Sequence, residues 1–132
     1  MATIVPAQLA GADKQIGSLA KGMYADLLLI RRNGTDANRT LLYASPADVR
    51  LVVIGGVPVY GDPDLMDRLL PRTELERLTV CGVAKKLYIK PQPGIPETAK
   101  TFKQISAELQ SKLSEWGTSL AELALCDGSN LN

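Results

Sequence analysis

The chain has 132 residues, of which 45% are hydrophobic and only 5% aromatic, and its formal net charge is +1. This size and composition predict one folded domain with an aliphatic core, and the scattered basic residues lack the patch or stripe typical of nucleic-acid binders. The sequence contains no histidine, which excludes His-based zinc sites, Ser-His-Asp triads and Cys-His dyads.

The first predicted elements are a short helix, a strand and a polar loop. Residues 2–9 predict a short helix, because a proline is tolerated in a first helical turn. The unbroken apolar run at 25–30 predicts a strand that is buried on both faces. Polar residues 33–39 predict a loop, and we expect a short helix or ordered turn at 41–44, followed by a turn at 45–48.

The strongest local signal is a β-hairpin. Residues 49–54 and 57–60 are rich in β-branched side chains, and Gly55 and Gly56 separate them. Both glycines adopt positive φ without steric cost, so the pattern predicts a primed two-residue turn. Pro58 has no N–H to donate, which predicts that the second strand lies at an edge or has that position facing outward.

The second half predicts a helix, another hairpin and a stiff linker. Residues 63–70 form a short helix in this prediction, with Pro63 at its first position. The second hairpin is expected from 78–81 to 86–89, with Gly82 in its turn, and the prolines of 91–96 predict a linker.

An amphipathic helix is predicted near the C-terminus. It begins at Glu97 or Thr98 and ends at Gly117, and a short apolar piece follows at 120–125. Its apolar stripe, interpreted as core, consists of Phe102, Ile105, Leu109, Leu113 and Trp116. The predicted fold class is therefore α+β and mainly β: a partial β-sandwich built from hairpins, with a C-terminal amphipathic helix.

The two cysteines and the chain's hydropathy bear on its compartment. Cys81 and Cys126 fit no metal-ligand spacing, and we interpret them as reduced, buried thiols and not as a disulfide. No apolar run is long enough to cross a membrane, and residues 1–10 do not have the pattern of a signal peptide. We therefore expect a cytoplasmic protein with no membrane partner and no nucleic-acid partner.

The order of several short motifs between Ile16 and Asp62 resembles a known family. They are Ile16-Gly17-Ser18-Leu19, Lys21-Gly22, Ala25-Asp26-Leu27 with the apolar residues after it, Pro46-Ala47-Asp48-Val49-Arg50 and Val59-Tyr60-Gly61-Asp62, all preceded by Ala2-Thr3. This series is similar to the C-terminal end of amidohydrolase-superfamily enzymes, which include metal-dependent deaminases and chlorohydrolases. The second half resembles a C-terminal extension found in some members.

The resemblance implies a scaffold without a catalytic centre. In the family, the metal ligands lie in a (β/α)8 barrel, ahead of the segment that matches here, so no functional residue is carried over. The matching segment belongs to a small composite β-sandwich whose N-terminal strands come from the start of the full chain. Residues 1–71 thus correspond to the sandwich segment. Residues 72–132 form an extension that we expect to pack into the same domain.

Few residues qualify as catalytic candidates, and each has a structural interpretation that we favour. Asp26 and Asp48 are expected to serve turns, not to form an acid–base pair. A Ser-Lys dyad of Ser45 with Lys85 or Lys86 is the remaining nucleophile arrangement, and we do not favour it. Cys81 lacks an activating group and is interpreted as an inert strand cysteine. We predict no catalytic, cofactor-binding or metal-binding residue, and no cofactor.

The predicted function is a non-catalytic accessory or oligomerisation domain derived from an amidohydrolase. The first alternative is a separate subunit that completes a metal-dependent amidohydrolase in trans, and the second is a stand-alone module that binds a small ligand. Half a sandwich leaves apolar sheet surface and free strand edges in water, so we expect a homodimer or a partner chain that carries the barrel.

Overall fold

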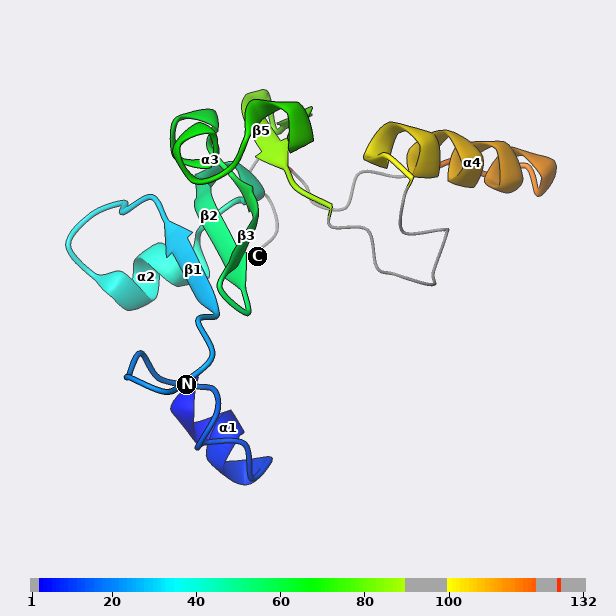
Figure 1. Cartoon of the computed structure of the whole chain (residues 1–132). Coiled ribbons are helices and arrows are strands. Elements are labelled where there is room, and N and C mark those ends of the chain that lie inside the picture. The colour runs from blue at the N-terminus through cyan, green and yellow to red at the C-terminus, as the bar shows by residue number, and fades with distance from the viewer. Residues whose placement is uncertain (1–2, 90–99, 121–125, 127–132) are drawn as a thin grey trace.

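A computed structural model describes residues 3–89, 100–120 and 126. Its centre is one antiparallel sheet of five strands in the order β1-β2-β3-β5-β4 (Figure 1). The bounds of the strands are β1 Leu27–Ile30, β2 Val49–Ile54, β3 Val57–Gly61, β4 Glu76–Val80 and β5 Val83–Leu87. The bounds of the helices are α1 Ile4–Leu9, α2 Ala37–Leu42, α3 Pro63–Leu69 and α4 Phe102–Glu115. The α+β class is confirmed. The described strands form a single sheet, so a sandwich stays a prediction.

Two hairpins supply four of the five strands. Gly55 and Gly56 have φ of 56° and 82°, which confirms the primed turn between β2 and β3. The turn between β4 and β5 is Cys81-Gly82, also with positive φ at both positions. Cys81 therefore lies in a turn, and the prediction of a strand position was wrong. Because β5 pairs with β3, the sheet continues across the boundary at residue 71.

Pro58 is tolerated because of where β3 pairs. β3 lies between two strands, yet β5 pairs only with Tyr60 and Gly61. Pro58 sits opposite Val53 of β2, next to a register shift. The missing N–H of the proline thus falls where β3 has a ladder on one side only.

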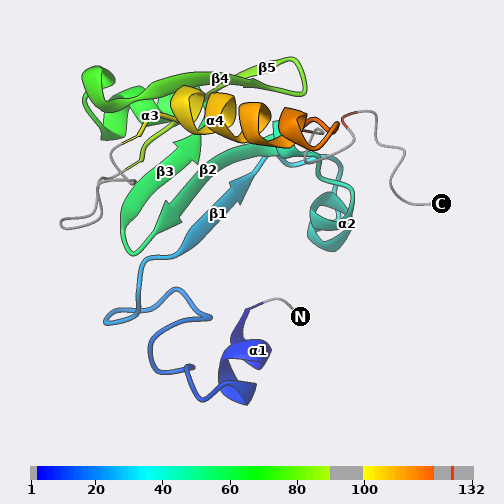
Figure 2. The ribbon, with the colours of Figure 1, turned by 90° about the vertical axis from the view of Figure 1, so that its right-hand side faces the viewer.

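The helices lie around the sheet at different distances. α3 packs against β3, β5 and β2, and its Met66 is completely buried. In both ribbon views α1 lies beyond the N-terminal end of β1. α4 stands apart from the sheet in Figure 1 and overlaps it only in projection in Figure 2. Within the N-terminal segment, the backbone at Gly17 packs closely against Ala7 of α1. A Cβ at position 17 would lie only 2.8 Å from the Cβ of Ala7, so the contact has room only for glycine.

Two helix boundaries differ from the prediction because side chains cap them. α2 begins inside the expected loop, since Asp36 Oδ1 accepts hydrogen bonds from the N–H groups of Asn38 and Arg39 at 2.8 and 3.3 Å. α4 begins after Thr101, which forms a capping box with Gln104, and not at Glu97 or Thr98. The predicted linker at 91–96 lies outside the described residues, as does all but Leu120 of the predicted piece at 120–125.

Burial contradicts two expectations about the core. The leucines of β1 were predicted to be buried on both faces, but Leu27, Leu28 and Leu29 are 38%, 58% and 46% exposed. The stripe of α4 was interpreted as core, but Phe102, Leu109 and Trp116 are exposed. The physical reason is the same in both places: no second layer of described residues covers these side chains.

Candidate functional site

The most deeply buried polar group is the ammonium of Lys85 on β5. Its side chain is 0% exposed. Nζ donates to the carbonyl oxygens of Ala47 and Val49, both at 2.8 Å, and to Asp62 Oδ1 at 2.6 Å. An ammonium has three protons to donate, and each has an acceptor here. Lys85 is therefore fully engaged in tying β5 to the start of β2, which leaves no free amine for a nucleophile or base.

Asp62 links this buried cation to the surface. Its Oδ2 accepts from Nε of Arg50 at 2.9 Å, and Arg50 also reaches Asp64 at 3.3 Å. Burial raises the pKa of Asp62, but the hydrogen bonds from Lys85 and Arg50 outweigh it, so the pKa lies below its ordinary value. The hydrogen bond from Asp62 in turn raises the pKa of Arg50. Asp62 thus stays ionised near neutral pH, as an anchor for two cations.

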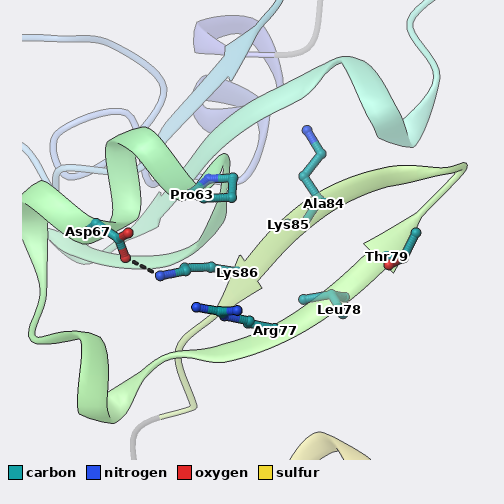
Figure 3. Close-up of a pocket in the computed structure, with 8 residues that line it drawn as sticks. All are labelled: Pro63, Asp67, Arg77, Leu78, Thr79, Ala84, Lys85 and Lys86. Carbon is teal, nitrogen blue, oxygen red and sulfur yellow. Dashed lines mark hydrogen bonds and ion pairs between the residues drawn. The ribbon is translucent and has the colours of Figure 1, made fainter.

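A second ion-pair cluster lines a hollow of about 410 Å³ between α3 and the β4–β5 hairpin. Figure 3 shows Lys86 directed toward Asp67, with Arg77 beside it and Lys85 leaving the strand in another direction. Lys86 is buried and pairs with Asp67, which also pairs with Arg72 at 3.3 Å. The hydrogen bond from Lys86 lowers the pKa of Asp67. Asp67 of the same chain therefore already provides the anion that pairs with the cations of this hollow.

Another hollow, of about 460 Å³, lies beside α2. It contains Arg31, and Arg39 with its guanidinium 5.8 Å from the ring centroid of Tyr43. Asp36 and Asp48 supply carboxylates to the same wall. Asp36 caps α2 and Asp48 closes the turn before β2, so these groups serve local structure.

The structure gives the catalytic candidates from the sequence structural roles. Asp26 Oδ1 accepts from the N–H of Gly55 at 2.7 Å, and Asp48 accepts from the N–H and hydroxyl of Ser45 at 2.9 and 2.8 Å. The backbone hydrogen bond from Ser45 lowers the pKa of Asp48. Asp48 thus closes the turn that begins at Ser45, as expected, whereas Asp26 holds the β2–β3 turn, 29 positions away in the sequence. Ser45 bonds to Asp48 and not to Lys85, so these residues form no Ser-Lys dyad.

The expectation for the cysteines was wrong. Cys81 and Cys126 form a disulfide with a Cα–Cα distance of 5.1 Å, across a sequence separation of 45 residues. The two cysteines are close in the folded chain, and their spacing in the sequence does not indicate this. The bond joins the chain after α4 to the β4–β5 turn.

Many of the large apolar side chains are exposed. Only Ala7, Val53 and Met66 are buried apolar residues in the described part of the chain. Exposed large apolar side chains occur on β1, on α2, on the β2–β3 hairpin and on α4. They include Leu27, Leu28, Leu29, Leu41, Leu42, Ile54, Phe102, Leu109 and Trp116. This distribution is typical of a surface that another layer covers.

Sequence reasoning missed the cluster that the buried Lys85 and Asp62 form with the partly exposed Arg50. A usable signal was the pair Lys85-Lys86 within a short strand, because successive side chains point to opposite faces, and a strand inside a sheet turns at least one of them toward the protein. Within residues 3–89, 100–120 and 126, no group of three or more potential ligands that could hold a metal ion was found, nor a helix able to cross a membrane.

Comparisons with known proteins found no matching protein family, no matching curated protein and no matching solved structure.

Proposed function

We propose that this chain is a non-catalytic accessory domain that acts by assembling with another polypeptide. The observation that carries the proposal is the imbalance between a core of very few apolar side chains and the many large apolar side chains that are exposed on β1, at Ile54 of the β2–β3 hairpin and on α4. Monomeric proteins seldom expose contiguous apolar patches of more than a few hundred Å². A partner that covers this surface supplies the missing layer.

The chemistry of the polar groups supports the same proposal. The ammonium of Lys85 donates all three of its protons to acceptors of the same chain, and neighbouring cations keep Asp62 and Asp67 ionised. A general acid or base needs a pKa near the working pH and room for a substrate proton. Depressed carboxyl pKa values and a saturated amine favour a structural role for these clusters.

The partner that we propose is a second copy of the chain. Light scattering coupled to size-exclusion chromatography, over a range of micromolar concentrations, measures the mass directly. We expect twice the monomer mass of 14.2 kDa and little binding of an apolar dye to the dimer. A monomer at every concentration, with no dye binding, contradicts the proposal.

The amidohydrolase origin of the domain is a further proposal, supported by the order of the motifs between Ile16 and Asp62. It implies that the chain is a fragment or remnant of a hydrolase that acts on carbon–nitrogen bonds other than peptide bonds. The purified chain should then neither hydrolyse cyclic amides nor deaminate nucleobases. Turnover that disappears on chelation of metals contradicts the non-catalytic assignment.

The sequence pattern alone favours a cytoplasmic location, whereas the Cys81–Cys126 disulfide favours an oxidising compartment, so the redox state of these cysteines in the cell decides between the two. A reducing cytosol keeps most thiols reduced. Rapid acid quenching of cells followed by thiol alkylation would count the free thiols of Cys81 and Cys126. Two alkylated thiols support a cytoplasmic location, whereas a closed disulfide in the quenched sample contradicts it.

A further inference from the structure

The two end strands of the sheet differ in their side chains. β4 carries Glu76, Arg77 and Thr79, and the carboxylate of Glu76 accepts the N–H of Phe102 at 2.9 Å. β1 consists of Leu27–Ile30 and has neither a charge nor a proline. Charged side chains and prolines on an end strand oppose pairing with another chain. Of the two ends, β1 is therefore the one suited to pairing.

The hydrogen-bond direction along β1 identifies which backbone groups face outward. The carbonyl of Ala25 accepts the N–H of Gly56 at 3.0 Å, and the N–H of Arg31 donates to the carbonyl of Asp48 at 2.7 Å, with a register shift against β2 between Leu29 and Ile30. In an antiparallel ladder alternate residues bond to the same neighbour. The odd-numbered residues of β1 thus face β2, and the N–H and C=O groups of Leu28 and Ile30 face the other side, where no strand of the described residues pairs with β1.

We propose, on the basis of the function proposed above, that two copies of the chain join their β1 strands antiparallel about a two-fold axis at Leu29. An axis perpendicular to the sheet requires one residue to lie opposite its own copy, because only then do opposite side chains share a face. With Leu29 on the axis, Leu28 of each copy lies opposite Ile30 of the other. The outward groups of both pairs form backbone hydrogen bonds, and the two sheets become one sheet of ten strands.

Charge complementarity selects this register. With Leu29 on the axis, Asp26 of each copy lies opposite Arg32 of the other, so the junction has an opposite-charge pair at each end. With Leu28 on the axis instead, Asp26 would lie opposite the apolar Ile30. The N–H of Gly55 already orients the carboxylate of Asp26 through Oδ1. Arg32 is held in its own chain as well, since Nε donates to the carbonyl of Gly34 at 2.9 Å and Nη2 to the carbonyl of Thr35 at 2.8 Å, so the charge pair at the junction would use the remaining N–H groups of the guanidinium.

Two cysteine variants test the register as a matched pair. A non-hydrogen-bonded antiparallel pair has a Cα–Cα distance of about 4.5 Å, which a disulfide spans, so L29C should cross-link to its own copy under mild oxidant. In this register the two copies of residue 28 are about 9 Å apart, beyond the reach of a disulfide. L28C is therefore the control, and wild-type protein controls for exchange with the native disulfide.

A charge variant tests the ends of the junction. R32E places two carboxylates opposite each other at both ends, and should raise the dimer dissociation constant roughly tenfold in sedimentation equilibrium. R31E is the control, because residue 31 alternates to the other face and is opposite an apolar residue in this register. Its effect should stay within about threefold.

The outcomes separate this inference from the function on which it rests. A wild-type dimer with rapid cross-linking of L29C, slow cross-linking of L28C and weakening by R32E supports the β1 junction. A wild-type dimer in which L29C does not cross-link, or L28C cross-links faster, overturns the junction while dimerisation itself stands. A wild-type monomer overturns both.

Discussion

Replacement of Lys85 by methionine tests whether the buried ion pair holds the sheet to the start of β2. K85M keeps the length of the side chain and removes the three donors. The carbonyl oxygens of Ala47 and Val49 lose their donor, and Asp62 loses its closest cation while retaining Arg50. Removal of one partner of a buried ion pair costs about 3–5 kcal/mol, mainly because the remaining groups stay buried without compensation.

The expected shift in melting temperature follows from chain length. An unfolding entropy of about 2.1 cal/mol/K per residue gives about 0.28 kcal/mol/K for 132 residues. A loss of about 3–5 kcal/mol therefore lowers Tm by about 11–18 °C. Thermal and urea unfolding, followed by circular dichroism at one fixed protein concentration, measure the change without a contribution from mass action.

Lys112 provides the matched control for this substitution. It is 75% exposed and pairs with the exposed Glu115 at 2.9 Å, so K112M should change stability by less than about 0.5 kcal/mol. If K85M costs as little as K112M, the three contacts of Lys85 do not stabilise the fold, and the structural role assigned to Asp62 is wrong as well.

Three more predictions concern acid, packing and the disulfide. The pKa of Asp62 is lower in the folded chain than in the unfolded chain, so its stabilisation is present above about pH 4 and decreases as pH falls toward the folded pKa, and D62N should flatten this acid limb in urea titrations. In G61A the new Cβ would lie 2.6 Å from the carbonyl oxygen of Arg50, and we expect urea unfolding to show a loss of about 1–3 kcal/mol. Reduction of Cys81–Cys126 opens a loop with a separation of 45 residues and should lower the unfolding free energy by about 2–4 kcal/mol in urea melts with and without reductant.

Local chemistry made much of the secondary structure predictable. The Gly55-Gly56 turn requires positive φ at two successive positions, and Gly-Gly is one of the few residue pairs that favour this conformation, with Asn-Gly and Asp-Gly. The helix at Pro63–Leu69 begins at a proline, and α4 carries an apolar stripe with a period of 3.6 residues. These signals lie within a few residues of the structure they specify, so one sequence is enough to recognise them.

What could not be predicted depends on contacts between distant residues. Lys85 is 23 positions from Asp62 and 38 from Ala47, and Cys81 is 45 from Cys126. No propensity or periodicity reports such distances. The exposure of β1 has the same origin, because an unbroken leucine run predicts a covered strand but does not state whether the cover belongs to the same chain.

The buried charges and the exposed leucines are consistent with each other if the chain completes its folding when it assembles. In the described residues, charged side chains occupy buried positions at Lys85, Lys86 and Asp62, while leucines of β1 remain in contact with water. Buried ion pairs contribute little net stability, but they fix which groups must meet, because an unpaired buried charge is costly. Such pairs suit a chain that must hold one arrangement of its strands before its apolar side chains find cover. The hydrophobic stabilisation then comes from the surface that a second chain removes from water, which makes the stability of this domain dependent on its own concentration.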